Sequence, residues 1–180
     1  TPVINNKTIA SMLLCDIGQF YLGEKFLIMK KIKSFEVNHD KLEKGIYISR
    51  VDEDITTYDI RMVKPNTPPY LENDGIHTFE HIFATYIRNS DYSKNIIYVG
   101  PMGCRTGFYL LTRNLEHEKA LNLVKETFRF IENFEGNIPG ALRKECGNYK
   151  DHNLKKAKQY AKKMNSILEN WNVDDLEYNK

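Results

Sequence analysis

The chain has 180 residues, 41% of them hydrophobic and 28% charged, which is the composition of an ordinary globular protein with one compact domain. Its formal net charge of +2 gives no electrostatic reason to expect a nucleic-acid partner, and no apolar run approaches the ~20 residues that span a bilayer. The three cysteines, Cys15, Cys104 and Cys146, are too few and too scattered for a disulfide framework. We therefore expect a cytoplasmic protein with neither nucleic acid nor membrane as a partner.

The N-terminal segment and the first strands are distinguished by composition. Residues 1–28 lack the charged start, the long apolar run and the cleavage site of a secretory signal. We interpret them as an N-terminal extension, either foreign to the native protein or poorly ordered, and residues 29–180 as the domain. Residues 46–51 and 55–63 are rich in β-branched and aromatic residues and flank a short acidic turn, which predicts a hairpin.

Helical periodicity begins after a proline-rich loop. Residues 76–89 carry apolar residues at helical spacing, with Asp74 as a possible N-cap. The apolar stripe consists of Ile76, Phe79, Phe83 and Ile87. The other predicted elements are a buried strand (96–99), a tight loop (100–104), a strand from Phe108 to Thr112, an amphipathic helix (116–133) with Leu121, Val124, Phe128 and Ile131 on one stripe, a short turn (141–145) and a last helix (151–170). Strands followed by helices predict a single α+β domain, in which an antiparallel-leaning sheet is packed with helices on one side.

The sequence His77-Thr78-Phe79-Glu80-His81 carries the sharpest chemical signal. On a helix, His77 and His81 lie on the same face and can point two imidazoles at one ion, with Glu80 beside it. This arrangement is typical of a metal ion with an adjacent proton-transfer group. The pattern is short, so two ordinary helix histidines and a surface glutamate explain it about equally well.

Two cysteines add to this signal. Cys146 follows the short turn and precedes Gly147, where the backbone can bend around an ion. Two imidazoles and one thiolate would leave a fourth position open, as in catalytic sites, and would favour zinc or ferrous iron. Cys104 lies in a turn rich in glycine and proline, where Arg105 or a metal would favour the thiolate. Taken singly, each is more often a structural thiol.

Five segments, in order along the chain, resemble the S-ribosylhomocysteine lyase family, known as LuxS. They are Ser34–His39, Tyr58–Met62 with Lys64–Asn66, Gly75–His81, Pro101–Tyr109, and Glu145–Gly147 with Asp151–Leu154. The likeness covers roughly residues 30–170, and no single segment is as specific as the set. It implies that residues 34–39 form the family's opening strand.

The resemblance also implies an activity and the residues that perform it. The chain would be a metal-dependent lyase that cleaves S-ribosylhomocysteine to homocysteine and 4,5-dihydroxypentane-2,3-dione, the autoinducer-2 precursor, by carbonyl migration and β-elimination. The metal, Fe(2+) with zinc as a possible substitute, would be held by His77, His81 and Cys146. Glu80 and Cys104 would be the acid–base groups, and Ser34, His39 and Arg61 would contact the ribose or arrange the site. The family also implies a homodimer with sites at the interface.

Two departures from the family pattern keep other functions open. The family carries an acidic residue and a serine where this chain has Tyr98 and Gly100. A catalytically impaired homologue that acts as a ligand-binding module is therefore one alternative. The H-x-x-E-H order is also that of inverted zinc peptidases, whose third ligand is a carboxylate, and a structural zinc domain is a third alternative.

Overall fold

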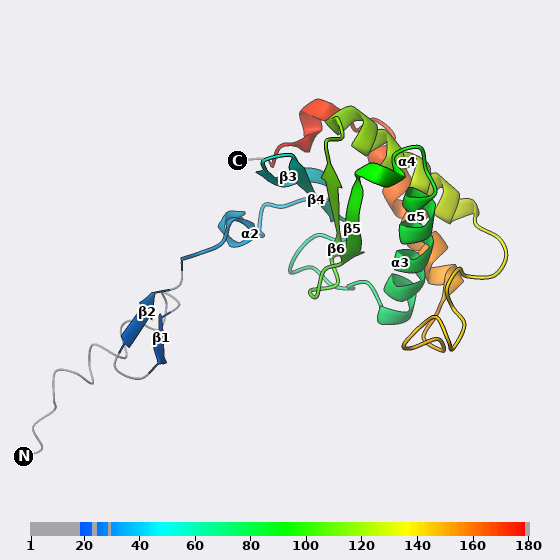
Figure 1. The fold of residues 1–180 in the computed structure, drawn as a ribbon, viewed down its shortest axis with the longest axis horizontal. Helices are drawn as coiled ribbons and strands as arrows, with labels where there is room; N and C mark the ends of the chain where they lie inside the picture. Colours follow the sequence, from blue (N-terminus) through cyan, green and yellow to red (C-terminus); the bar gives the residue numbers. More distant parts are fainter. Residues whose placement is uncertain (1–18, 23–24, 29, 179–180) are drawn as a thin grey trace, which may run out of the picture. The chain divides into compact units, whose positions relative to one another are not determined.

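The computed structural model describes residues 19–22, 25–28 and 30–178, in two units that divide at residues 37 and 38 (Figure 1). In the first unit, β1 (Gln19–Leu22) pairs antiparallel with β2 (Lys25–Ile28), and α2 (Lys33–Glu36) is a single helical turn. The predicted boundary between an extension and a domain at residues 28 and 29 stays a prediction.

The expected opening strand over residues 34–39 is wrong. Ser34 lies in α2, and residues 37–39 belong to a bend and a turn. The physical reason is local: the Phe35 N–H donates to the Ile32 carbonyl at 2.9 Å, and the Lys41 N–H donates to the Asn38 carbonyl at 3.2 Å. These two backbone N–H groups are therefore satisfied within turns.

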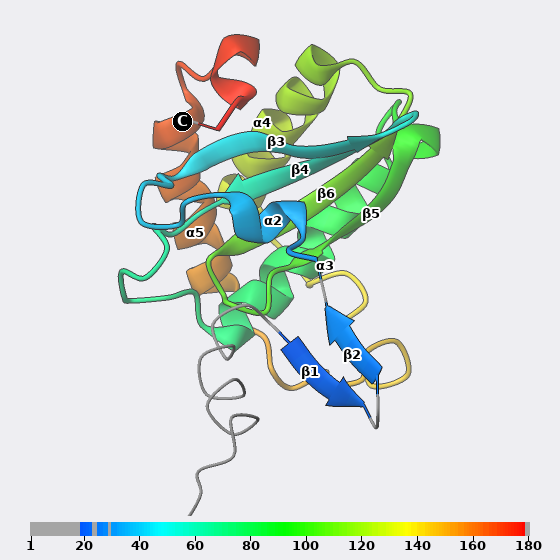
Figure 2. The same cartoon turned by 90° about the vertical axis from the view of Figure 1, so that its left-hand side faces the viewer.

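The second unit is the α+β domain that the sequence predicts. In chain order its elements are β3 (Gly45–Asp52), β4 (Ile55–Arg61), α3 (Asn73–Arg88), a 3-10 turn (Ser93–Asn95), β5 (Ile96–Pro101), β6 (Gly107–Arg113), α4 (His117–Asn133), α5 (Leu154–Leu168) and a 3-10 turn (Val173–Leu176). Within the described chain, the larger sheet has four strands in the order β3-β4-β6-β5, with every neighbouring pair antiparallel. The helices cover one face of it, as Figure 2 shows. No helix of the described residues is both long and apolar enough to cross a membrane.

The two faces of the sheet follow from the alternation of side chains along β4. Tyr58 and Ile60 are buried in the core beneath the helices. Asp59 and Arg61 alternate with them and therefore point to the opposite face. The strand ends at Arg61, two residues before the predicted end, because the N–H groups of Met62 and Val63 both donate to the Thr106 carbonyl.

Helix α3 packs its apolar stripe on the inner face of the sheet, as predicted. Ile76, Phe79, Phe83 and Ile87 are all buried. The Phe79 ring lies 5.1 Å, between centroids, from Phe108 of β6 and 5.1 Å from Phe128 of α4. These aromatic contacts anchor the helix that carries the histidines.

Two local predictions need correction. Asp74 is not the N-cap of α3, because the helix begins at Asn73 and Glu72 occupies the cap position. Strand β5 is not a buried strand, because Ile97 is 38% and Tyr98 51% exposed while Val99 is buried. It is an edge strand, and a register shift between Ile96 and Tyr98 interrupts its pairing with β6.

Candidate metal centre

Four side chains converge beside the first turns of α3. Donor atoms of His77, His81, Cys146 and His152 all lie within 4.8 Å of one another. The rings of His77 and His81 are 4.7 Å apart, as their spacing on one helix face predicts. The Cys146 sulfur lies 3.3 Å from Nε2 of His77. The structure therefore brings together the three residues that the sequence predicts as metal ligands.

Cys146 is held by the single helical turn that the sequence predicts before it. The N–H groups of Glu145 and Cys146 both donate to the Leu142 carbonyl, at 2.8 and 3.0 Å. The Asn148 N–H then donates to the cysteine sulfur at 3.4 Å. The turn and this backbone donor together fix the direction of the sulfur, which would bind a metal ion as the thiolate.

His152 joins this cluster without having been predicted to do so. Its ring stacks on that of His77, with centroids 4.1 Å apart, and its Nε2 is 4.0 Å from the Cys146 sulfur. The available sequence signal is a histidine six residues after Cys146, inside a segment that resembles the LuxS family. A spacing of this kind across a loop fixes no geometry, so the contact emerges only from the fold.

The segment that carries His152 is tied to the first turn of α3. The Asn153 N–H donates to Thr78 Oγ1 at 2.8 Å, and Asn153 Nδ2 donates to Asp74 Oδ2 at 3.0 Å. The Lys156 ammonium binds both Asp74 oxygens, at 3.0 and 2.9 Å. The hydrogen bond with Lys156 holds the pKa of Asp74 below its usual value, so Asp74 is ionised at neutral pH.

Backbone carbonyl groups orient the imidazoles of His77 and His81. Nδ1 of His77 lies 2.8 Å from the Asp151 carbonyl oxygen, and Nδ1 of His81 lies 2.8 Å from the Pro139 carbonyl oxygen. A carbonyl oxygen only accepts, so each Nδ1 carries a proton and Nε2 is the nitrogen that faces away from the carbonyl. This is the support that metal-binding histidines usually have.

The surroundings of His152 favour its neutral form. Burial, together with the neighbouring imidazoles of His77 and His81, lowers the pKa of His152 below its usual value. Its Nδ1 lies 3.2 Å from the hydroxyl of Thr78, which itself donates to the Asp74 carbonyl at 3.0 Å. A hydroxyl whose proton is used in this way accepts from the imidazole, which leaves the lone pair on Nε2.

The donor chemistry of the cluster fits a divalent transition metal. It offers imidazole nitrogens and one thiol in a half-buried setting, with no carboxylate among the four donors. Such a set suits zinc or ferrous iron and suits magnesium or calcium poorly. We therefore treat the cluster as a candidate metal centre.

A second group of polar side chains surrounds Cys104. Thr106 Oγ1 lies 3.0 Å from the Cys104 sulfur and accepts from the Arg61 guanidinium at 2.5 Å. The guanidinium lies 4.0 Å from the same sulfur. The positive charge of Arg61 therefore faces the Cys104 sulfur. The contact arises because β4 and β6 pair with Arg61 opposite Gly107, where an added Cβ would lie 2.0 Å from the Ile60 carbonyl oxygen.

Arg61 is itself fixed by a buried ion pair. Asp59 accepts from it at 2.5 and 3.1 Å, and both side chains are 3% exposed. Burial opposes the charge, but the carboxylate outweighs burial and raises the pKa of Arg61. Tyr178, near the end of the chain, donates to Asp59 at 3.0 Å and stacks on Tyr47 at 5.0 Å. Burial and then Asp59 raise the pKa of Tyr47 to about 12 and raise that of Tyr178, so both phenols keep their protons.

The remaining predicted residues are placed less tightly. Glu80 is half-buried on α3, one residue before His81. His39 is half-buried in the turn before β3. Ser34 belongs to the other unit of the chain, so its position relative to the cluster is not described. The substrate-contact roles of Ser34, His39 and Arg61 stay predictions.

The two departures from the family pattern form one structural feature. Tyr98 and Gly100 are two residues apart on β5, and a Cβ at position 100 would lie 2.1 Å from the Tyr98 hydroxyl. The tyrosine ring thus lies over the glycine and takes the space that a serine side chain would need. Because Tyr98 is 51% exposed, its ring has room to move.

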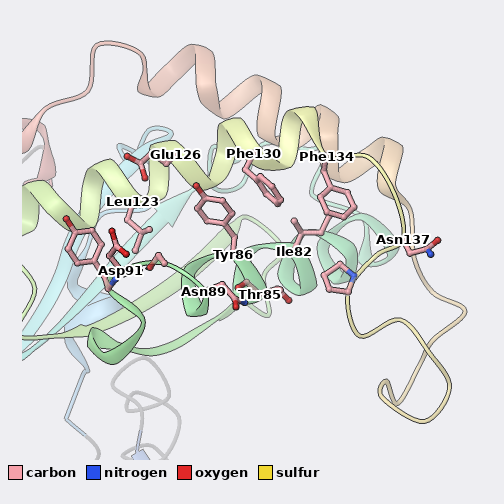
Figure 3. Close-up of a pocket in the computed structure, with 13 residues that line it drawn as sticks. Ile82, Thr85, Tyr86, Asn89, Asp91, Leu123, Glu126, Phe130, Phe134 and Asn137 are labelled. Atoms are coloured by element: carbon pink, nitrogen blue, oxygen red, sulfur yellow. Dashed lines mark hydrogen bonds between the residues drawn. The ribbon is translucent and has the colours of Figure 1, made fainter.

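A groove of about 570 Å³ lies between α3 and α4, close to the cluster but separate from it (Figure 3). Its walls are largely apolar and aromatic, and they include Ile82, Tyr86, Phe130 and Phe134. Its lining residues include none of the four cluster residues and neither Cys104 nor Arg61. The candidate metal ligands and the Cys104 group therefore lie outside this groove.

Comparison with known proteins agrees with this geometry. The profile of the S-Ribosylhomocysteinase (LuxS) family matches residues 32–174. An S-ribosylhomocysteine lyase of Borrelia garinii is 51% identical over 156 residues, which cover 83% of this chain and 99% of that protein. S-ribosylhomocysteine lyases of Phocaeicola vulgatus and Clostridium acetobutylicum are 48% and 44% identical, over 83% of this chain and 98% and 99% of their own lengths.

Proposed function

The chain belongs to the S-ribosylhomocysteinase (LuxS) family, and on this premise we propose that it is an S-ribosylhomocysteine lyase. It cleaves S-ribosylhomocysteine to homocysteine and 4,5-dihydroxypentane-2,3-dione, the precursor of autoinducer-2. The observation that carries the proposal is the convergence of His77 and His81 of α3 with Cys146. A family match alone would not exclude a member that had lost its site.

Three residues would bind the metal ion that serves as the Lewis acid. His77, His81 and Cys146 would bind a divalent ion, ferrous iron with zinc as a possible substitute. When bound, such an ion polarises the sugar carbonyl and stabilises the negative charge that develops on its oxygen. The backbone carbonyls of Asp151 and Pro139 keep the two imidazoles in the orientation that this binding needs.

Two side chains move the protons. The sugar carbonyl must travel from C1 to C3, and each move removes a proton from one carbon and returns a proton to its neighbour. We assign this transfer to Cys104, whose sulfur faces the Arg61 guanidinium, and to the carboxyl group of Glu80 on α3. Ser34, His39 and Arg61 would hold the ribose hydroxyls or arrange the site.

Carbon–sulfur cleavage follows by β-elimination. With the ketone at C3, a base removes the proton from C4, the electron pair forms the C4–C5 double bond, and the C5–S bond breaks. Homocysteine leaves as the thiolate and takes up a proton. The enol that remains gains a proton at C5 and becomes the dione, so no oxidant or reductant is consumed.

A thiol-release assay tests the function. The whole chain, loaded with Fe(2+) or Zn(2+) without oxygen, is incubated with S-ribosylhomocysteine, and free homocysteine is measured with a thiol reagent. We expect catalytic release of one thiol for each substrate consumed. Metal-loaded protein that releases no thiol above background would contradict the lyase and favour the ligand-binding module suggested by Tyr98 and Gly100. The peptidase alternative is disfavoured because the third donor is a sulfur and not a carboxylate.

We also propose that the active form is a homodimer in which both subunits line each site. The Cys104 sulfur contacts Arg61 and Thr106, while the metal cluster is built by α3 and residues 146–152. Among the described residues, no hydrogen bond or ring contact joins these two groups. A site that needs both is completed naturally by pairing Cys104 of one subunit with the metal cluster of another.

Subunit complementation tests the shared site. Cys104→Ala and Cys146→Ser proteins, each inactive alone, are mixed under conditions that exchange subunits. Half of the dimers become mixed, and each of these has one site with both an intact thiol and an intact metal cluster. We therefore expect recovery of up to about one quarter of the unsubstituted activity, by mass action. No recovery, although sedimentation shows exchange, would place Cys104 and the metal in the same subunit.

A further inference from the structure

We propose that His152 is a positioning residue of the metal centre, whose Nε2 accepts a hydrogen bond from a hydroxyl group of the sugar bound at the fourth coordination position. This inference rests on the proposed function and deepens it. It gives a role to His152, which is the member of the four-residue cluster that is not among the three predicted metal ligands. The ligand group that it recognises is an α-hydroxycarbonyl or its enediol, in which a hydroxyl is carried by the carbon next to the carbonyl or enol carbon.

The direction of the His152 ring supports this role. Nδ1 faces the Thr78 hydroxyl at 3.2 Å, and the opposite nitrogen, Nε2, faces the cluster, 4.0 Å from the Cys146 sulfur. Stacking on His77 fixes the plane of the ring. Because the Thr78 hydroxyl already donates to the Asp74 carbonyl, it accepts from Nδ1, and the opposite nitrogen is the one that can accept a hydrogen bond. That acceptor matches a sugar hydroxyl, which has a proton to donate.

The distances place His152 just outside the inner ligand set. Bond lengths of about 2.3 Å to sulfur and 2.0–2.1 Å to nitrogen in a tetrahedral site separate the two donors by about 3.5 Å. The His77 nitrogen, at 3.3 Å from the Cys146 sulfur, is close to this separation, and the His152 nitrogen lies further out, at 4.0 Å. A fourth protein ligand would also close the position that the substrate needs. His152 is therefore better suited to hold the substrate than to bind the ion.

The support of His152 is stronger than a surface loop requires. The backbone N–H of its neighbour Asn153 donates to the Thr78 hydroxyl and to the Asp74 carbonyl. The Asn153 side chain donates to the Asp74 carboxylate. Thr78 is 0% exposed, so the hydroxyl that orients His152 is itself immobile. This frame keeps Nε2 in place before a ligand arrives, which lowers the entropic cost of making the hydrogen bond.

Paired isosteric variants test the proposal in the Cys104→Ala background, where we expect turnover to be slower by about 100-fold or more. His152→Asn keeps a group at the Nδ1 position for Thr78 but places no acceptor at the Nε2 position. His152→Gln places an acceptor oxygen near the Nε2 position. Each protein is loaded with Co(2+), its absorption spectrum and bound metal are recorded, and S-ribosylhomocysteine is titrated against the cobalt absorption. His81→Gln serves as the control for a true ligand.

We expect both His152 variants to bind one equivalent of cobalt with the parent spectrum, unlike His81→Gln. The Kd for S-ribosylhomocysteine should rise by about tenfold in His152→Asn, the scale of one lost hydrogen bond, and should largely recover in His152→Gln. Loss of cobalt or a changed substrate-free spectrum would show that His152 is a ligand and overturn the proposal. Equal Kd values in all proteins would overturn it as well. Failure of the lyase assignment would show differently, as no thiol release by the unsubstituted chain, and the inference would then fall with it.

Discussion

Replacing Cys104 with alanine should leave the metal content unchanged and lower kcat by about 100-fold or more. The thiol is not part of the four-residue cluster, and its contacts are with Arg61 and Thr106. Losing a group that transfers protons typically costs this factor or more. The measurement is steady-state thiol release, with bound metal determined in the same samples.

Glu80→Gln is the companion variant, because glutamine keeps the shape of the side chain and removes its ability to exchange a proton. We expect the same pattern of retained metal and a loss of at least about 100-fold in kcat. Ala84→Ser, one helical turn along α3 from Glu80, is a suitable control. It changes a half-buried residue that belongs neither to the metal cluster nor to the group around Cys104. If Glu80→Gln instead lost the metal, Glu80 would belong to the ligand set and not to the acid–base pair.

Replacing Cys146 with serine should remove the metal and, with it, the activity. A thiolate is a soft, charged ligand, whereas serine offers a neutral hydroxyl that binds zinc or ferrous iron far more weakly. The substitution is small, and the histidines and their carbonyl partners stay as they are. We therefore expect the protein to fold, to hold much less than one equivalent of metal after dialysis, and to release no homocysteine above background.

Thermal unfolding gives an independent reading of the same change. A metal that binds only the folded protein raises its unfolding temperature by mass action. Added Zn(2+) should therefore raise the Tm of the unsubstituted chain and have little effect on Cys146→Ser. Retention of metal and of the Tm response in Cys146→Ser would contradict the ligand assignment, and a carboxylate ligand, as in the peptidase alternative, would then have to be sought.

Local periodicity was enough to predict the scaffold of the site. The spacing of Ile76, Phe79, Phe83 and Ile87 predicted both the helix and its buried face, and the same rule put His77 and His81 side by side. These are properties of one regular element, and the geometry of a helix relates residues three and four apart without help from the rest of the chain. The hairpin of β3 and β4 was predicted on similar grounds.

Local patterns failed where neighbouring elements decide the outcome. The apolar run in β5 predicted a buried strand, but the strand lies at the edge of the sheet and leaves Ile97 and Tyr98 exposed. The family resemblance, and not a local pattern, implied a strand over residues 34–39, where the structure instead has a helical turn followed by a bend. A sequence window records the preference of a segment and not the partners that are available to it.

The sequence by itself thus determined the α+β class, the helix with its two histidines and, through family likeness, the chemistry to expect. Only the tertiary structure brought Cys146 to within 3.3 Å of His77, 69 residues away in the chain, and set His152 beside them. Only strand pairing put Arg61 of β4 next to Cys104 in the turn before β6. The physical reason is that contacts across long loops depend on which hydrogen bonds close those loops, here the bonds of Asn153 to Thr78 and Asp74.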